Sequence, residues 1–353
     1  MLLGMTADQT HLPDAPALPG LAFRLFRDES DYAHIVELIN TCSVADGVED
    51  HVTIEWAANY FTHIGEFDPR RDILFATIDE RPVGWVRGQV KRLVEGRRVC
   101  IVNGGVLKQW RRRGIGRALH GWAERHLRDR AAALPAEGPR VFRSFAAETE
   151  VDTIALLSAA GYEAVRHHCE MVRLLVEPIP DVPLPAGLEV RPAQPAQYRQ
   201  VIAALDEAFR DLWSHSDMTD VDYERWINDP NFQPQLWQVA WAGGEVAGMV
   251  LNFIDRQYNE EFKRLRGWTD PIGVRRPWRK QGLAKALIVR SMRLLQEQGM
   301  SEAGLGVDAQ NPNGALRLYE SLGFRVMKRF TTFERPLDKA ERQDQVDAAV
   351  RME

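Results

Sequence analysis

Cysteine is scarce in this chain, which has only Cys42, Cys100 and Cys169 and no C-x-x-C pair. Such widely spaced cysteines argue against a disulfide framework and against a cysteine zinc site, so we expect no metal and a reducing, cytoplasmic setting. No apolar run reaches the roughly 18 residues that a membrane-spanning helix needs, so no membrane association is expected. The first residues lack the basic and apolar segments of a signal peptide, and we expect residues 1–20 to form a flexible lead-in.

An excess of basic residues is also missing. The chain has 45 Lys and Arg against 50 Asp and Glu, a formal net charge of −5, whereas nucleic-acid-binding domains are usually basic. We therefore expect no nucleic-acid partner and interpret arginine clusters as local sites. A hydrophobic fraction of 45% in 353 residues is typical of a globular protein with more than one hydrophobic core, which favours two domains.

Two stretches of the chain repeat each other. QWRRRGIGRAL contains Gly114, and RPWRKQGLAKAL contains Gly282 in the same place. Downstream, Gly161 and Gly323 recur in the same order and at nearly the same offset, each followed by an aromatic residue. Two landmarks at one offset indicate two homologous halves.

Each half has the pattern of an α/β (α+β) fold, with a central mixed sheet flanked by helices. The hydrophobic pattern predicts a hairpin over Leu236–Ile254 around Gly-Gly, a strand ending at Val274 and a helix over Leu283–Gly299. We expect an N-terminal domain over 21–176 and a C-terminal domain over 188–338. A proline-rich linker over 177–187 joins them, and a charged tail over 339–353 follows.

A basic loop joins the strand ending at Val274 to the helix that opens at Gly282. The first turn of such a helix has N–H groups without partners and the positive end of the dipole, and small residues let a phosphate approach. The loop lacks the Gly-Lys-Ser/Thr of a Mg-nucleotide site and a G-x-G-x-x-G that opens directly from a strand. Because it occurs twice in matched contexts, we favour a diphosphate-binding loop over an ordinary basic surface loop.

These loops resemble the R/Q-x-x-G-x-G/A acyl-CoA signature of the GCN5-related N-acetyltransferases, the GNAT superfamily. The residues that match it are Arg279, Gly282 and Ala284 in the second half, and Arg111, Gly114 and Gly116 in the first. The stretch Val307–Phe324 also resembles a later element of that family, through Asn311, Leu318, Tyr319, Gly323 and Phe324. In layout the chain is similar to tandem, two-domain members such as the mycothiol synthases.

The resemblance implies two tandem GNAT-like domains and an acyl-CoA-dependent N-acetyltransferase. Acetyl-CoA would be the co-substrate and a primary amine of a small molecule the acceptor. The strand before the loop would pair with the pantetheine arm, and the helix start would bind the pyrophosphate. The residues implied to bind the co-substrate are Ile272, Gly273, Val274, Arg279, Lys280, Gln281, Gly282, Leu283, Ala284, Lys285 and Asn311, and, in the first half, Val106, Arg111, Arg113, Gly114, Ile115, Gly116 and Arg117.

The resemblance also implies that Tyr319 protonates the leaving thiolate, a role that suits a phenol because it is neutral at pH 7. Asp270 is the candidate general base, because it precedes Val274 by four positions and would face the same side of a continuous strand. Family members often carry a glutamate where Trp268 stands, so a water-mediated base or no dedicated base stays open.

The first half has a different residue at the position of the acid. When Gly161-Tyr162 is aligned with Gly323-Phe324, Leu157 falls at the Tyr319 position. Because leucine cannot protonate a thiolate, we expect the first half to be degenerate and the C-terminal half to be catalytic. Tyr162 or Cys169 stays open as an alternative acid there.

The acceptor side is expected among aromatic residues that lie close to carboxylates, a combination that suits a cationic amine. The candidates are Phe209, Trp213, Tyr223 and Trp226. The alternative is that these side chains are part of the core. Three other functions stay open: a non-catalytic acyl-CoA-binding or sensing protein, acetylation of a protein N-terminus or lysine, and nucleic-acid binding. The assembly is expected to be a monomer or a homodimer.

Overall fold

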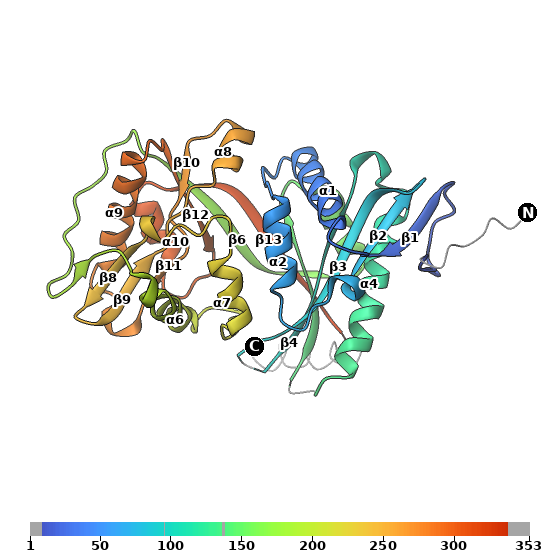
Figure 1. Ribbon diagram of the computed structural model, residues 1–353, viewed down its shortest axis with the longest axis horizontal. Coiled ribbons are helices and arrows are strands. Elements are labelled where there is room, and N and C mark those ends of the chain that lie inside the picture. The colour runs from blue at the N-terminus through green and yellow to red at the C-terminus, as the bar shows by residue number, and fades with distance from the viewer. Residues whose placement is uncertain (1–8, 95, 136–137, 338–353) are drawn as a thin grey trace, which may run out of the picture. The chain divides into compact units, whose positions relative to one another are not determined.

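The structure, a computed structural model (Figure 1), describes residues 9–94, 96–135 and 138–337. These residues form two compact units, a first unit of 9–165 with 331–337 and a second unit, Arg166–Phe330. The tail expected over 339–353 lies outside the described residues. Among the described helices, none is both long and apolar enough to cross a membrane.

The first unit is a mixed sheet with helices. Its elements, in chain order, are β1 (Leu21–Leu25), α1 (Asp31–Asp46), α2 (Ile54–Thr62), α3 (Pro69–Asp72), β2 (Ile73–Ile78), β3 (Arg81–Arg92), β4 (Arg98–Val106), η1 (Lys108–Trp110), α4 (Ile115–Ala132), β5 (Arg140–Ala147) and α5 (Val151–Ala159). Strands β1 to β4 pair antiparallel in chain order, and β4 pairs parallel with β5 over Arg98–Ile101 only. The predicted mixed sheet is therefore confirmed here.

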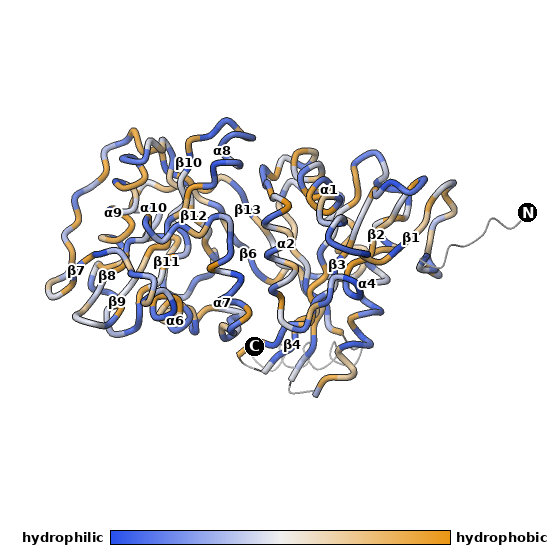
Figure 2. Tube along the Cα trace, in the orientation of Figure 1, coloured by the Kyte–Doolittle hydropathy of each residue, from blue (hydrophilic) through white to orange (hydrophobic). Residues whose placement is uncertain are grey.

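Helices cover both faces of this sheet, so every residue of β2 is buried. Leu74 belongs to the core on the α4 side with Ile115, whereas Phe75 packs on the other side with Ile35 and Phe61 of α1 and α2. Five of the six residues of this strand are therefore apolar, with Thr77 the exception. Figure 2 colours the chain by hydropathy.

The second unit has the same plan. Its elements are β7 (Glu189–Val190), η2 (Pro195–Gln197), α6 (Tyr198–Phe209), α7 (Asp220–Ile227), η3 (Pro234–Leu236), β8 (Gln238–Ala242), β9 (Glu245–Val250), α8 (Arg256–Phe262), β10 (Arg266–Trp268), β11 (Ile272–Val274), η4 (Arg276–Trp278), α9 (Leu283–Glu297), β12 (Glu302–Asp308) and α10 (Ala315–Ser321). The predicted hairpin is confirmed as β8 and β9, which turn at Gly243 and Gly244, and the predicted helix is confirmed as α9.

Two long strands pair across the expected domain boundary. Strand β6 (Glu163–Leu174) pairs antiparallel with β12, from His168 opposite Asp308 to Leu174 opposite Glu302. Strand β13 (Arg325–Pro336) lies beside β5, and the N–H of Leu337 donates to the carbonyl of Arg140 at 2.9 Å. The last strand of each sequence half thus completes the sheet of the other unit, so the compact units do not follow the expected 21–176 and 188–338.

Buried ion pairs fix β13 to the first unit. The Glu334 carboxylate, on a residue that is 8% exposed, accepts from Nε of Arg143 at 2.8 Å and from Arg97 at 2.6 Å. The neighbouring Arg335 lies 2.5 Å from the buried Glu124 carboxylate of α4. Strand β13 is therefore anchored by charge as well as by its position in the sheet.

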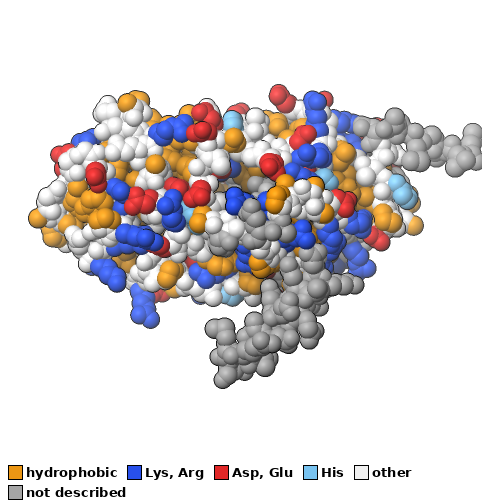
Figure 3. Space-filling model, turned by 90° about the horizontal axis from the view of Figure 1, so that it is seen from below, with side chains coloured by type: hydrophobic (Ala, Val, Ile, Leu, Met, Phe, Trp, Pro, Cys, Tyr) orange, Lys and Arg blue, Asp and Glu red, His pale blue; other side chains and the backbone are white. Residues whose placement is uncertain are grey.

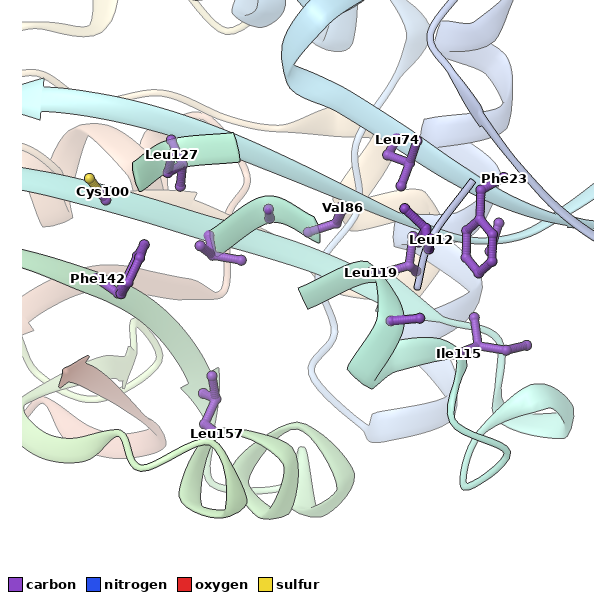
Figure 4. Close-up of a cluster of buried hydrophobic side chains, with 14 of the residues drawn as sticks. Leu12, Phe23, Leu74, Val86, Cys100, Ile115, Leu119, Leu127, Phe142 and Leu157 are labelled. Atoms are coloured by element: carbon purple, nitrogen blue, oxygen red, sulfur yellow. The ribbon is translucent and has the colours of Figure 1, made fainter. Parts of the chain in front are cut away.

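The lead-in expected to be flexible is ordered over residues 9–20. Leu12 is 3% exposed and lies with Leu119 and Phe23 in the core of the first unit (Figure 4). The N–H of Thr10 donates to the carbonyl of Phe23 at 2.7 Å, and Asp14 pairs with Arg125 of α4 at 2.8 Å. The expectation is wrong for these residues because isolated leucines in a proline-rich segment reach the core, although they form no periodic pattern.

The linker expected over 177–187 has no helix or strand. It still packs on the second unit, where Ile179, Val182 and Leu184 lie against the core. Arg293 of α9 donates to the carbonyl of Pro180 at 3.1 Å. The segment therefore runs along the second unit.

Replacing Glu334 with alanine should destabilise the first unit selectively. The change leaves Arg143 buried without its carboxylate, which typically costs about 3–5 kcal/mol of unfolding free energy. Hydrogen exchange in urea should show this loss in peptides of β4 and β5, whereas peptides of α9 and β12 change little. The control is Glu37→Ala at an exposed position of α1. Equal losses in both units would contradict the assignment of β13.

Candidate functional site

The sheet of the second unit divides at residues 269–271. Strand β10 pairs parallel with β12 as far as Trp268, and the N–H of Thr269 still donates to the carbonyl of Gly304 at 2.8 Å. From Ile272 onwards the chain pairs with β9 instead. The single strand expected before Val274 is thus two short strands, and the argument that Asp270 and Val274 share one face of it is wrong.

The register of β11 determines which of its backbone groups face β9. The carbonyl of Pro271 accepts from Leu251 at 3.0 Å, and the N–H of Arg275 donates to Ala247 at 3.1 Å. Because alternate residues of an antiparallel strand bond to opposite sides, the N–H groups of Ile272 and Val274 point away from β9. They form a strand edge that an extended amide chain could join.

The loop after β11 turns so that the start of α9 follows directly. Lys280 and Gly282 both have positive φ, 59° and 85°, and a Cβ placed at Gly282 would meet nothing within 4 Å. The first-turn N–H groups of α9 have no intrahelical acceptor and favour an anion. Lys280 and Lys285 have no carboxylate partner among the residues that the structure describes. Of the other predicted residues here, Leu283 is buried in the core, Ala284 follows it in α9, and Gln281 bonds to the carbonyl of Pro277.

The side chain of Arg279 binds protein groups at the ends of β11 and α6. Its Nε donates to the carbonyl of Val274 at 2.9 Å, and its other nitrogens donate to Asp211 at 2.7 Å and to the carbonyl of Ala208 at 2.9 Å. Arg276 also pairs with Asp211. The first arginine of the motif therefore connects the loop to the end of α6.

A carboxyl and a phenol interact beside the strand division. Tyr319 of α10 is 7% exposed, and burial followed by the charge of Asp270 raises the pKa of its hydroxyl. Burial also raises the pKa of Asp270 to about 6, although the N–H of Gly306, 3.3 Å away, works in the opposite direction. At neutral pH the pair therefore consists of a carboxylate and a protonated phenol.

Glycines on β12 leave room for the side chains of Trp268 and Asp270. A Cβ at Gly304 would lie 3.0 Å from the ring of Trp268, and a Cβ at Gly306 would lie 3.2 Å from the Asp270 carboxylate. At the end of the strand, Asp308 pairs with Arg166 of β6 at 2.6 Å. Sequence reasoning missed Arg166, because β6 belongs to the other half of the repeat, and it missed the two glycines, because no local pattern shows what packs beside them.

The four aromatic residues proposed for the acceptor do not form one cluster. Phe209 and Trp226 pack partly buried against the core beside α6, and Tyr223 lies under the guanidinium of Arg199 at 4.1 Å. Only Trp213 is connected to the end of β12, through the guanidinium of Arg166, which is 5.4 Å from its ring. Asn311 forms the turn before α10, where its side chain accepts from the N–H of Asn313.

The first unit repeats the loop geometry. Arg112 and Gly114 have φ of 59° and 89°, and Nε of Arg111 donates to the carbonyl of Val106 at 2.8 Å. Arg113 stacks on Trp110, and Ile115, Gly116 and Arg117 form the first turn of α4. The backbone of the loop is therefore the same in both units.

The surroundings of this first loop differ from those of the second. Pro16 of the lead-in would be 3.1 Å from a Cβ at Gly114, so the chain itself covers that position. Asp152 pairs with Arg112 at 2.6 Å and lies 3.5 Å from Arg111, which reduces the positive charge of the loop.

Leu157 stands at the place of Tyr319, as the alignment predicts. Its carbonyl accepts from the N–H of Tyr162 at 3.0 Å, as that of Tyr319 accepts from Phe324 at 3.1 Å. The Tyr162 hydroxyl is buried and donates to Glu124, and burial followed by that charge raises its pKa. Cys169 is buried in the core of the second unit. Neither alternative acid is therefore placed for acid chemistry in the first unit.

One group of side chains could offer several metal ligands within the described residues, namely Asp206, His215 and Asp217. Within this group, His215 Nε2 lies 3.2 Å from an Asp206 oxygen, and Arg210 lies 3.6 Å from Asp217. On the face shown in Figure 3, Lys and Arg side chains lie among Asp and Glu side chains.

The model of the acetyltransferase (GNAT) family matches residues 33–136 and 198–324. The chain belongs to this family. Mycothiol acetyltransferases are among its relatives: that of Thermobispora bispora is 31% identical over 169 residues, 47% of this chain and 57% of the relative. That of Salinispora tropica is 30% identical over 218 residues, 61% of this chain and 66% of the relative. The matches thus span less than two thirds of these two relatives.

Solved structures extend the likeness to the whole tandem fold. A GCN5-related N-acetyltransferase from Sphaerobacter thermophilus has a TM-score of 0.66 and 25% identity, over 93% of this chain and 97% of that one. A tandem GNAT protein from the clavulanic acid biosynthesis pathway has a TM-score of 0.64 over 90% and 99%, at 16% identity. The expected tandem GNAT fold is therefore confirmed.

Asp270→Asn should remove a pH dependence of stability. The pKa of Asp270 is raised from 3.8 to about 6 on folding, so its ionisation destabilises the folded state as the pH rises through this range. Wild type should lose about 1–2 kcal/mol of unfolding free energy between pH 5 and pH 8 through this group, and the variant should not. Urea titrations of both proteins at the two pH values measure this difference. Parallel curves would mean that the pKa of Asp270 is not raised on folding.

Proposed function

We propose that this protein is an acyl-CoA-dependent N-acetyltransferase that transfers an acetyl group from acetyl-CoA to a primary amine of a small molecule. The working site lies in the second unit. The observation that carries the proposal is the free edge of β11, where the N–H groups of Ile272 and Val274 point away from β9, followed by the open helix start at Gly282.

Backbone groups would bind the acetyl-CoA. The N–H groups of Ile272 and Val274, on the edge of β11 that faces away from β9, suit the amides of the pantetheine arm and the thioester carbonyl. The first-turn N–H groups of α9, with Lys280 and Lys285 beside them, suit the diphosphate. Each part of the co-substrate thus meets a group of matching polarity.

The chemistry is direct attack of the amine on the thioester. Asp270 takes a proton from the amine, directly or through water, and the neutral nitrogen forms the new C–N bond. The C–S bond then breaks, Tyr319 gives its proton to the leaving thiolate, and the resulting phenolate takes the extra proton from the nitrogen of the new amide. The raised pKa of Tyr319 keeps the phenol protonated until the C–S bond breaks. The products are the amide and the CoA thiol.

Three differences argue against turnover in the first unit. Leu157 replaces the acid, Pro16 covers Gly114, and Asp152 pairs with the basic residues of the loop. The first unit is therefore proposed to have a structural role, and one chain binds one acetyl-CoA.

The names of the curated relatives suggest which acceptor to test first. They are mycothiol acetyltransferases, so an amine related to mycothiol heads the panel, followed by aminoglycosides, polyamines and peptide N-termini. Release of the CoA thiol with any of these amines supports catalysis. Acetyl-CoA binding without thiol release across the panel would instead favour the non-catalytic binding protein. A cytoplasmic location and a monomeric or homodimeric state stay predictions.

Tyr319→Phe should lower kcat by about 100-fold or more, because a phenyl ring cannot protonate the thiolate. The dissociation constant for acetyl-CoA should change little. Tyr162→Phe is the matched control: it removes a buried hydroxyl in the first unit and should lower stability while kcat is retained. A thiol-release assay with calorimetry measures both properties. Unchanged kcat in Tyr319→Phe would refute the acid assignment.

Calorimetry should find one acetyl-CoA per chain. Lys280→Glu should weaken binding at least 10-fold because it places a negative charge beside the diphosphate. Arg112→Glu, at the equivalent position of the first unit, should leave the affinity within about 2-fold. Two binding sites per chain, or equal effects of the two variants, would contradict the proposal that the covered loop at Gly114 does not bind acetyl-CoA.

A further inference from the structure

The loop after β11, residues 275–281, is called the acyl-CoA loop, and the loop after β4, residues 107–113, is its counterpart in the first unit. In each of them an arginine joins a strand carbonyl to a carboxylate at a helix end. In the second unit, Arg279 connects the carbonyl of Val274 with the carboxylate of Asp211. Val274 is the last residue of β11, and Asp211 lies two residues beyond the end of α6. This contact joins the strand, the loop and the helix end, and we call it the arginine clamp.

The first unit has the same clamp with different residues around it. Arg111 donates to the carbonyl of Val106, the last residue of β4, at 2.8 Å. It also donates to both carboxylate oxygens of Asp46, the last residue of α1, at 2.5 and 2.7 Å. The first unit thus retains the clamp, although Pro16 covers its loop and Leu157 stands in place of the acid Tyr319. Its recurrence there indicates that it shapes the loop rather than binding phosphate.

Asp211 is the centre of the clamp in the second unit. Its carboxylate accepts from Arg279 and from Arg276, and these hydrogen bonds hold its pKa well below the usual value. The Arg279 side chain is 21% exposed, so most of its guanidinium lies against protein groups. A fork of this kind fixes geometry in a way that a single charge cannot.

Asp211 also begins the segment that leads to the acceptor side. Two residues further on, Trp213 lies against Arg166, which pairs with Asp308 at the end of β12. The segment between α6 and α7 is therefore attached to the acyl-CoA loop at one point and to the end of β12 at another. A change in the loop can reach the acceptor side through this segment.

We propose that Asp211 is a positioning residue that holds the acyl-CoA loop in its binding shape and couples it to the 210–219 segment. The inference rests on the proposed function. It differs from the expectation that Arg279 binds the pyrophosphate, because the two assignments give Asp211→Asn effects of opposite sign. Loss of a positioning residue weakens acetyl-CoA binding, whereas release of two arginines that bind phosphate would tighten it.

The test compares wild type with Asp211→Asn, which keeps the shape of the side chain and removes its charge. The dissociation constant and KM for acetyl-CoA should rise about 10- to 100-fold, as expected for the loss of charged hydrogen bonds. At saturating acetyl-CoA, kcat should stay within about 3-fold. Asp46→Asn is the matched control in the first unit and should lower stability with KM within about 2-fold.

Hydrogen exchange tests the coupling. Acetyl-CoA should slow exchange of residues 212–218 in wild type and should do so much less in Asp211→Asn at equal site occupancy. Arg279→Lys, which keeps the charge and loses the fork, should reduce this protection as Asp211→Asn does, and it serves for the exchange measurement if Asp211→Asn does not fold. Tighter binding, an unchanged KM or full protection in Asp211→Asn would overturn the proposal. Absence of thiol release by wild type would overturn only the proposed function, because affinity and exchange are measured without turnover.

Discussion

The division of the second sheet is the constraint on which the candidate site depends. Two parallel strands that stop pairing part-way leave backbone groups that need other partners. Asp270 supplies one, since its carboxylate accepts from the N–H of Gly306, and β9 supplies others to β11. The N–H groups of Ile272 and Val274, which point away from β9, are what remains for a ligand. The same division brings a carboxyl of raised pKa within electrostatic reach of Tyr319.

The repeated motif preserves backbone shape more faithfully than chemistry. Both loops have the same two positive φ values and the same clamp. Function depends on what surrounds each loop. One unit has an open glycine beside two lysines that have no carboxylate partner among the described residues, and the other has Pro16 and Asp152. A search for the motif alone would therefore report two sites where the surroundings favour one.

Local patterns predicted the hairpin of β8 and β9, the helix α9 and the alignment of Leu157 with Tyr319, because each depends on residues close in sequence. The rest depends on distant partners. No periodicity shows that the strand before Val274 breaks, that Asp211 engages Arg279, or that Leu12 reaches the core. The role of the acceptor aromatics stays a prediction, since helix spacing alone does not distinguish a core face from a binding face.

The exchanged strands have a consequence for synthesis of the chain. Strand β5 lies beside β13 in the folded protein, so its edge stays open until residues 331–337 have been made. At about 5–20 residues per second, translation of the second half lasts on the order of ten seconds or more. During that time the first unit is a nascent sheet with an exposed edge, which other chains can pair with. The first unit is thus synthesised first but completed last, because it lacks β13 until the end of translation. Chaperones that shield strand edges would act on this unit first.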